Sequence, residues 1–320
     1  MSKQNNVETI VTHAGVFHAD DVCAVAWLRI VGVEAGLARR VPSTEELADP
    51  NVLVVDVGGR HEPSLSNFDH HQRGGAGARW DSEIPYSGFG LVYDQFQPSN
   101  AFIAQRLHDR AVLPVDAIDT GWAPELEVWR GPDSAGLGDW VAPGKGHSVP
   151  PQPATLSFSA VISGFNPGPS ASPAERDAAF ETAVAFAQQV LENELRSAEE
   201  FVAAKEAVLS AHTTHAGSVL VLEKFVPWGE HVFCREDEAN LLYVLFPSER
   251  GGWMCQQIPV EPGSFEGRKP LPAAWAGLRD EAFAKATGVA DGVFCHPGRF
   301  IGGAKSRAGA ECLAALAVEA

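Results

Sequence analysis

The sequence predicts an α/β protein, in which an N-terminal domain with a mainly parallel sheet is followed by a long connecting helix and a smaller C-terminal α/β domain. Three observations predict it: a strand–helix–strand pattern in residues 8–57, an almost unbroken helical pattern from residue 172, and strand and helix patterns beyond residue 213. The length of 320 residues suits two domains of ordinary size. We therefore expect an N-terminal domain at 1–171, a connecting segment at 172–212 and a C-terminal domain at 213–320.

The N-terminal pattern begins with a short strand, "ETIVTH", that ends on His13. A glycine-containing loop and the helical segment "DDVCAVAWLRIV" follow it. The continuous apolar run "VLVVDV" then predicts a central strand that is covered on both faces. Strand, helix and strand in this order indicate a right-handed crossover between parallel strands. In open sheets of this kind, ligands bind beyond the carboxyl ends of the strands, where His13 and Asp56 both lie.

The rest of the N-terminal half is predicted to be mainly helical. Residues 86–96 and 99–120 have helical patterns, and Pro114 is placed to start the helix that carries Asp119. Residues 131–153 are rich in Gly and Pro and predict a long loop. The connecting segment begins with the capping signal "SPAE" and predicts either one bridging helix or two helices in line.

The C-terminal domain is predicted from three strand patterns, "GSVLVLEKFVPW", "NLLYVLFP" and "GWMCQQIPV", followed by the helical "PAAWAGLRDEAFAKATG". Its last unit is "GVFCH", "PGRFIGG" and the helical "AKSRAGAECLAALAVE". We interpret this unit as a strand, a turn at Gly302 and Gly303, and a helix start with Lys305 and Arg307. Free backbone N–H groups and cations would converge there, so this is a candidate anion site, with an ordinary tight turn as the alternative.

The composition is typical of a globular protein, with 45% hydrophobic and 20% charged residues and no run of 18 apolar residues. The start "MSKQNNVETI" does not have the basic-then-apolar layout of a secretion signal, so we expect a cytoplasmic protein. The five cysteines form no Cys-x-x-Cys pair. That spacing predicts buried free thiols rather than a disulfide framework or a zinc finger.

The formal net charge of −17 restricts the class of ligand. Proteins that clamp long duplex nucleic acid usually present a basic face to the phosphates. The acidic balance therefore disfavours extended duplex binding. It leaves open a small phosphorylated ligand, or the end of a single strand in a local positive pocket.

Four clusters of polar side chains in the N-terminal domain are candidates for chemistry. Each alone has a simple structural alternative: a cap or turn for Asp56 and Asp119, and a solvated turn for the paired histidines. Together they combine carboxylates and imidazoles without nearby thiolates, which suits first-row divalent metals better than structural zinc. Two such ions can activate a water and neutralise the oxygens of a phosphoryl displacement. The clusters are "THAGVFHADD" (His13, His18, Asp20, Asp21), "VVDVGG" (Asp56), "FDHHQR" (Asp69, His70, His71) and "AIDTG" (Asp119).

With these clusters in order, the sequence resembles the DHH phosphoesterase superfamily, whose name comes from the Asp-His-His motif. That superfamily includes RecJ-type exonucleases, oligoribonucleases and manganese inorganic pyrophosphatases. More closely, the chain is similar to the melanocyte proliferating gene one family, described as metal-dependent hydrolases and 3′–5′ RNA exonucleases. The resemblance covers nearly the whole chain and also includes "SGFGLVY", "PLPAAWAGLRDEA" and "FIGGAKSRAGA".

The resemblance implies a role for each matching position. Asp56 would be shared between two ions, and His71 would contact the scissile phosphate or protonate the leaving oxygen while Asp69 orients a neighbouring histidine. The remaining metal ligands would be His13 and His18 on one ion and Asp20, His70 and Asp119 on the other. His18 stands where the wider superfamily has an aspartate, as is typical of the closer family. The ligand set implies manganese, with magnesium as the second choice.

The resemblance also implies that the glycine-rich motif of the second domain holds the substrate over the metals. The implied contacts are Gly302, Gly303, Lys305 and Arg307, with Arg73 as a further candidate next to the paired histidines. Family members often have a histidine after the two glycines, whereas this chain has Ala304, so Lys305 or Arg307 would contact the phosphate instead.

The expected function is a two-metal phosphodiesterase, a 3′–5′ exonuclease on RNA or short single-stranded nucleic acid rather than on long duplexes. Two alternatives stay open from the sequence. One is hydrolysis of a small phosphate compound such as a dinucleotide or pyrophosphate. The other is a metal-binding regulatory protein without turnover.

Overall fold

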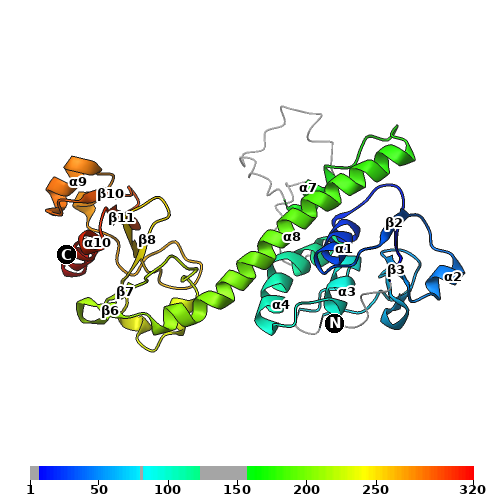
Figure 1. The fold of residues 1–320 in the computed structure, drawn as a ribbon, viewed down its shortest axis with the longest axis horizontal. Helices are drawn as coiled ribbons and strands as arrows, with labels where there is room; N and C mark the ends of the chain where they lie inside the picture. Colours follow the sequence, from blue (N-terminus) through cyan, green and yellow to red (C-terminus); the bar gives the residue numbers. More distant parts are fainter. Residues whose placement is uncertain (1–6, 80–81, 123–156) are drawn as a thin grey trace, which may run out of the picture. The chain divides into compact units, whose positions relative to one another are not determined.

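The computed structural model describes residues 7–79, 82–122 and 157–320, and it is a mixed α/β protein with two sheets (Figure 1). Two compact units, Met1–Arg196 and Ser197–Ala320, divide the chain inside helix α8 (Pro173–Ser210). The three-segment domain division expected from the sequence stays a prediction. The loop expected at 131–153 lies outside the described residues.

The sheet of the first unit is mainly parallel, with the strand order β2-β1-β3-β5-β4. Its central strands β1 (Thr9–Thr12), β3 (Val52–Val55) and β5 (Asn67–Phe68) pair in parallel, as does the edge strand β2 (Gly36–Arg39) with β1. Strand β4 (His61–Glu62) is antiparallel to β5. The apolar runs in β1 and β3 are buried because helices cover the sheet, as their composition predicts.

Helix α1 (Ala19–Ile30) is the central helix of the first unit. Ten consecutive residues, from Ala19 to Leu28, are buried, since α1 contacts β3, α3 (Gly88–Gln95), α5 (Leu113–Asp119) and α7 (Phe158–Ser163) (Figure 1). The small residues Ala19, Ala24 and Ala26 let these neighbours approach on every side. Helix α1 therefore places its first turn inside the unit.

The remaining helices of the first unit include predicted segments, such as α4 (Ala101–Leu107) and α5, and the unpredicted short helix α2 (Thr44–Leu47). Helix α4 runs through a π-helical turn (His108–Val112) into α5, which has Pro114 in its first turn and ends on Asp119 as predicted. Helix α8 is one continuous helix, which decides between the two alternatives for the connecting segment.

The second unit contains a six-stranded sheet in the order β10-β11-β9-β8-β7-β6. The pairing is antiparallel except between β7 and β8. Its strands are β6 (Thr213–Thr214), β7 (Val219–Val221), β8 (Tyr243–Pro247), β9 (Trp253–Gln257), β10 (Gly292–Cys295) and β11 (Ile301–Ala304), and its helices are α9 (Asp280–Thr287) and α10 (Arg307–Glu319).

Alternating strand residues build two cores in this unit. Tyr243 and Leu245 belong to a cluster with Ala310 and Leu313 of α10. The intervening residues of β8 belong to a second cluster that includes Val208, in the last turn of α8. Helices therefore cover both faces of the sheet, which follows from the period of two along each strand.

The predicted Gly-Gly turn is wrong. Gly302 and Gly303 lie inside strand β11, which pairs with β10 on one side and β9 on the other. A Cβ on Gly302 would lie 2.9 Å from the carbonyl oxygen of Phe294, and one on Gly303 would lie 3.1 Å from that of Trp253. The two glycines are therefore explained by close approach of neighbouring strands rather than by a turn.

Among the described residues, no helix combines the length and the apolar character that crossing a membrane requires.

Candidate metal centre

Three adjacent strands of the first sheet end at the same edge. His13 follows β1, Asp56 follows β3, and His70 and His71 follow β5 after one intervening residue. Because β1 and β5 both pair in parallel with β3, their carboxyl ends meet there. The structure thus brings together residues that lie up to 58 positions apart in the sequence.

The first turn of α1 supplies two buried carboxylates, Asp20 and Asp21, both fully buried. Asp21 Oδ1 accepts hydrogen bonds from the backbone N–H groups of His18 and Val22, each at 2.9 Å. Its Oδ2 lies 3.0 Å from His13 Nε2. The Nδ1 of His13 lies 3.2 Å from the Ala14 carbonyl oxygen, so the proton belongs on Nδ1 and a neutral ring offers Nε2 as a ligand.

Asp56 lies between the histidines. Its Oδ2 is 3.4 Å from His13 Nε2, and its Oδ1 is 3.1 Å from His70 Nε2 and 3.4 Å from His71 Nδ1. The two carboxylate oxygens therefore face different imidazoles, which is the geometry that sharing between two ions requires. Asp56 has a φ of 54°, a left-handed conformation that is strained for a non-glycine residue and is found disproportionately at functional sites.

Asp119 reaches the same cluster from the end of α5. His70 Nε2 lies 3.4 Å from Asp119 Oδ2 and 3.7 Å from Asp20 Oδ2. Each of these carboxylates comes from a different helix, whereas His70 comes from the sheet edge. The cluster is consequently defined by tertiary packing and not by any local motif.

Among the described residues, ligand atoms within 4.8 Å of one another form three groups that could hold a metal ion. The first ion predicted from the resemblance would use His13 and His18, but in the structure these two histidines belong to different groups. His18 gathers with Asp20 and Asp119, and His13 gathers with a carboxylate outside the predicted set, Asp21. The groups are His13, Asp21 and Asp56; His18, Asp20 and Asp119; and Asp56, His70 and His71.

The electrostatics of the cluster call for a cation. Burial raises the pKa of Asp20 well above its ordinary value, and the neighbouring carboxylates of Asp56 and Asp119 raise it further. Burial is also the main reason why the pKa values of Asp21 and Asp119 are raised. Burial alone would lower the pKa of His13, but its hydrogen bonds with Asp21 and Asp56 raise it to about 10. Closely packed buried carboxylates destabilise one another unless a positive charge neutralises them.

The hydrogen bonding and the chemical type of these side chains also fit a divalent metal ion. Asp20 Oδ1 is a buried oxygen without a hydrogen-bond donor within the described ranges, and Asp21 Oδ2 and Asp56 Oδ1 face imidazole nitrogens at 3.0 and 3.1 Å. Buried carboxylate oxygens without donors are costly unless they coordinate a cation. Mixed imidazole and carboxylate ligands of this kind suit manganese or magnesium.

Asp69 is a fully buried side chain that holds His71 in place. Its Oδ1 accepts hydrogen bonds from the backbone N–H of His71 at 3.2 Å and from Nδ1 of the same ring at 2.8 Å. Its Oδ2 accepts a hydrogen bond from the Gly59 backbone N–H. Because a carboxylate only accepts, the proton lies on Nδ1 and the exposed ring directs Nε2 away from Asp69.

Residues at the start of α3 make hydrogen bonds to buried carboxylates in and next to the cluster. The backbone N–H of Gly88 lies 3.3 Å from Asp20 Oδ2, and Ser87 donates its hydroxyl hydrogen bond to Asp116 at 2.6 Å. Asp116 also pairs with the buried guanidinium of Arg79, at 2.8 Å. A Cβ on Gly90 would lie 2.4 Å from Asp116, so the "SGFG" pattern permits this close packing.

Hydrogen bonds from two side chains hold the backbone of the loop between His13 and His18. Asn166 Oδ1 accepts a hydrogen bond from the Phe17 backbone N–H at 3.0 Å, and its Nδ2 donates one to the Phe17 carbonyl oxygen at 2.8 Å. Arg39 donates a hydrogen bond to the Gly15 carbonyl oxygen at 3.0 Å. Both contacts fix the backbone of the loop that carries the two histidines.

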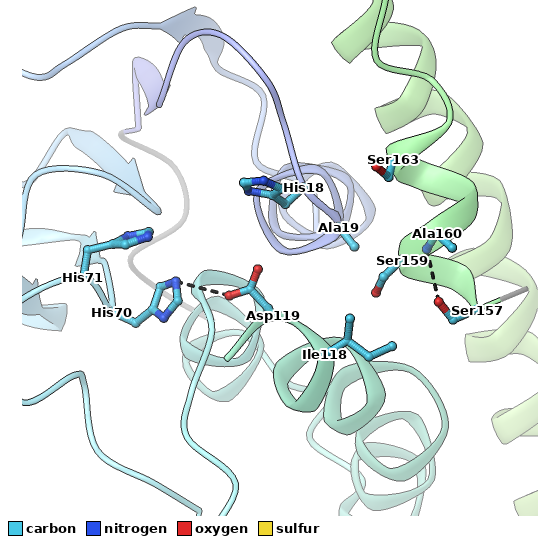
Figure 2. A pocket seen from close by; sticks show the side chains of 10 residues that line it. All are labelled: His18, Ala19, His70, His71, Ile118, Asp119, Ser157, Ser159, Ala160 and Ser163. Atoms are coloured by element: carbon cyan, nitrogen blue, oxygen red, sulfur yellow. Dashed lines mark hydrogen bonds and ion pairs between the residues drawn. The ribbon is translucent and has the colours of Figure 1, made fainter. Parts of the chain in front are cut away.

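A pocket of about 460 Å³ opens beside the cluster (Figure 2). His18, His70, His71 and Asp119 lie on one side of it, and helix α7 faces them from the other side (Figure 2). The volume is within the range of small-ligand sites. The remaining lining residues are Ala19, Ile118, Ser157, Ser159, Ala160 and Ser163.

Of the residues predicted to contact substrate, Arg73 belongs to the first unit and Gly302, Gly303, Lys305 and Arg307 belong to the second. Arg73 is exposed in the turn beyond His71 and does not line the pocket. In the second unit, Gly303 and Lys305 line a separate pocket of about 240 Å³ together with Arg250. Arg307 is engaged in ion pairs of 2.9 Å with Glu223 and with Glu311.

The start of helix α10, predicted as an anion site, already binds an internal carboxylate. Asp291 Oδ2 accepts hydrogen bonds from the backbone N–H of Ser306 at 2.8 Å and from its hydroxyl at 2.6 Å. A carboxylate at a helix N-terminus is stabilised by the free N–H groups and by the helix dipole. The substrate-contact roles of Gly302, Gly303, Lys305 and Arg307 stay predictions.

Sequence reasoning did not assign a role to Asp21, although the residue stands next to Asp20 in "HADD". The geometry of an α-helix could have indicated a separate role for Asp21. Side chains of adjacent residues in a helical turn point about 100° apart, so two adjacent buried aspartates are directed toward different candidate metal-binding groups. The serines of α7 gave no signal because their pattern is that of an ordinary short helix.

Comparisons with known proteins identify relatives along nearly the whole chain. The family described as "MYG1_exonuc: Uncharacterised protein family (UPF0160)" matches residues 9–318. The chain is 30% identical to the MYG1 exonuclease of Rattus norvegicus, over 94% of this chain and 82% of that protein. It is 29% identical to the MYG1 exonuclease of Homo sapiens (95% and 84% covered) and 30% identical to a MYG1 protein of Saccharomyces cerevisiae (96% and 93% covered). No solved structure matches the chain.

Proposed function

The chain belongs to the MYG1 exonuclease family (UPF0160), and from this membership and the geometry of the metal centre we propose that it is a two-metal phosphodiesterase. We propose a 3′–5′ exonuclease activity on RNA or on short single-stranded nucleic acid. The relatives named as exonucleases support a nuclease and hence a nucleic acid substrate. The net charge of −17 supports a short or single-stranded substrate rather than a long duplex.

One observation carries the proposal. Among the described residues, three groups of carboxylates and imidazoles lie together, two of which share Asp56, and the buried Asp20 Oδ1 has no donor; a pocket of about 460 Å³ opens beside them. A structural role alone does not explain why so many like charges are buried together, because each raises the free energy of its neighbours.

The residues that would hold two divalent ions come from the three groups. Asp56 would be shared, His13 and Asp21 would lie on one side of it, and His70 would lie on the other with Asp20, His18 and Asp119 close by. Manganese is the first candidate and magnesium the second. When bound, such ions would lower the pKa of a water molecule and neutralise charge on the phosphoryl oxygens.

His71 would act on the leaving group. Asp69 accepts the Nδ1–H hydrogen bond at 2.8 Å and orients the ring, so that Nε2 is placed to donate a proton to the leaving oxygen. Burial of Asp69 keeps the ring in one orientation. We also propose that Arg73, Gly302, Gly303, Lys305 and Arg307 contact the substrate, as the resemblance of their motifs implies.

The membership of the chain in the wider DHH phosphoesterase superfamily is part of the proposal. The order of the motifs and the buried Asp69 beside His70 and His71 are consistent with it.

The test uses the purified full chain with manganese or magnesium and four substrates: end-labelled RNA, single-stranded DNA, a dinucleotide and pyrophosphate. The proposal predicts metal-dependent shortening of RNA from the 3′ end. Release from the dinucleotide or pyrophosphate alone would instead support the small-phosphate hydrolase. Tight manganese binding without turnover of any substrate would contradict catalysis and leave the regulatory alternative.

A further inference from the structure

Helix α7 forms one wall of the pocket beside the metal centre. Ser157, Ser159, Ala160 and Ser163, which we name the α7 wall, line the pocket from the side opposite His70 and His71 (Figure 2). None of these side chains belongs to the groups that could hold a metal ion. They are therefore placed to contact a substrate and not an ion.

The hydroxyls of the α7 wall differ in what they bond. Ser157 Oγ accepts a hydrogen bond from the Ala160 backbone N–H at 3.1 Å and so caps the helix. The hydroxyls of Ser159 and Ser163 make no hydrogen bond within residues 7–79, 82–122 and 157–320, and both line the pocket. Each hydroxyl can donate one hydrogen bond and accept two.

The pocket also has an apolar patch between the α7 wall and the charged residues. Ile118 is 45% exposed although it is a large aliphatic residue, and Ala19 and Ala160 lie on the same pocket surface. An exposed aliphatic side chain beside charged groups is suited to pack against a ring of a ligand. The pocket thus offers a charged end, an apolar patch and two hydroxyls.

The α7 wall is fixed with respect to the metal centre. Asn166 follows α7 and makes two hydrogen bonds to the backbone of Phe17, the residue before His18. Helix α7 also contacts α1 and α5, which carry Asp20 and Asp119. The distance between the hydroxyls and the charged end of the pocket is therefore set by direct contacts.

We infer that the α7 wall binds the sugar of the nucleoside next to the scissile phosphate, with Ser159 and Ser163 hydrogen-bonded to its 2′-hydroxyl and Ile118 packed against the nucleoside. The inference rests on the proposed phosphodiesterase function. The 2′-hydroxyl is both a donor and an acceptor, and it is the group that distinguishes RNA from DNA at a single position. The α7 wall therefore makes the site selective for ribonucleotides.

The experiment compares two matched substrates with the purified full chain and manganese. One is a short RNA, and the other has the same sequence with a 2′-deoxy sugar at the reacting terminal nucleotide. The variants are Ser159→Ala, Ser163→Ala and the double substitution. Ser210→Ala is the control, because Ser210 is a helical serine in the other unit whose hydroxyl donates to the Glu206 carbonyl oxygen.

We expect each single substitution to lower kcat/KM for the ribo substrate by about threefold to tenfold, the effect of one hydrogen bond, with little change for the deoxy substrate. The ratio between the two substrates should fall most in the double variant and stay constant in Ser210→Ala. Equal losses on both substrates, or no loss on either, would overturn the inference.

A second measurement keeps the inference separate from the proposed function. If the wild-type chain turns over neither substrate, the proposed function fails. The sugar preference is then measured as the affinity for AMP against 2′-deoxy-AMP in the presence of manganese. Tighter binding of AMP that is lost in the double variant supports the inference, and equal affinities overturn it.

Discussion

Asp21 provides the sharpest prediction about the metal centre, because it was absent from the ligand set expected from the sequence. Replacing it by asparagine keeps the shape of the side chain. The amide oxygen can still accept the two backbone hydrogen bonds at 2.9 Å that Asp21 Oδ1 accepts. The amide nitrogen then faces His13 Nε2, where Oδ2 lay at 3.0 Å. The change removes one negative charge and one ligand oxygen from the group around His13.

The expected loss of manganese affinity follows from the number of ligand atoms that remain. The group of His13, Asp21 and Asp56 would lose one of its three ligand atoms, and only Asp56 would remain as its carboxylate. We expect manganese to bind about 100-fold more weakly at this site, equivalent to about 2.7 kcal/mol. The site around His70 does not contact Asp21, so its affinity should change much less.

The assay is calorimetric titration of manganese into the metal-free chain, with circular dichroism to establish that the variant is folded. The wild type should bind two ions, and Asp21→Asn should bind one with nearly unchanged affinity. Asp49→Asn is the matched control, since Asp49 is exposed and its side chain accepts a hydrogen bond from the Asn51 backbone N–H. Two sites of wild-type affinity in Asp21→Asn would refute the assignment.

Three further substitutions test the loop contact of Asn166, the packing at Gly90 and the role of His71. Asn166→Ala removes two hydrogen bonds to the Phe17 backbone and should lower the free energy of unfolding by about 2 kcal/mol in urea denaturation, with weaker manganese binding. Gly90→Ala places a Cβ 2.4 Å from the buried Asp116 carboxylate and should destabilise the chain by about 1–3 kcal/mol in the same assay. His71→Ala should reduce kcat on labelled RNA by about 100-fold or more while manganese stoichiometry is kept.

Each of these predictions has a matched control or a contrary result. Asn166→Asp keeps the acceptor for Phe17 N–H but places a carboxylate oxygen against the Phe17 carbonyl oxygen, so it should be no more stable than the alanine variant, and wild-type stability would contradict the role of Nδ2. Gly168→Ala adds a Cβ in open space, so it should leave stability unchanged. Gly90→Ala with wild-type stability would show that the packing at Asp116 is loose. Loss of one bound manganese ion in His71→Ala would make His71 a ligand and not a proton donor.

The sequence predicts the fold of the first unit well where burial dominates. The apolar runs of β1 and β3 and the helical pattern of α1 have one stable arrangement, because each buries a continuous surface. The edge strand β2 carries no such run and is half-buried or exposed, so its pattern predicts no strand. Register and pairing at an edge depend on the neighbours and not on the strand itself.

Glycine motifs were harder to interpret. "FIGGA" predicts a turn because consecutive glycines are common in turns, yet Gly302 and Gly303 lie in a central strand. The reason is the close approach of Phe294 and Trp253 from the adjacent strands, and Trp253 is 50 positions away from Gly303 in the sequence. A local pattern does not contain that information.

The sequence predicts which residues form the candidate site but not which of them gather around the same ion. The motif order identified His13, Asp56 and His70 as neighbours, and the structure places all three at one sheet edge. The partition of ligands into groups depends on the direction of side chains at the start of α1. That direction is decided when α1 packs against α3 and α5, which no spacing rule describes.

The most direct test of the central claim is the number and place of metal ions bound to the wild-type chain. In crystals grown with manganese, anomalous scattering should reveal two peaks roughly 3.5–4 Å apart on either side of the Asp56 carboxylate. One peak should be near His13 and the other near His70. A single peak, or two peaks that do not share Asp56, would contradict a two-metal phosphodiesterase at this site.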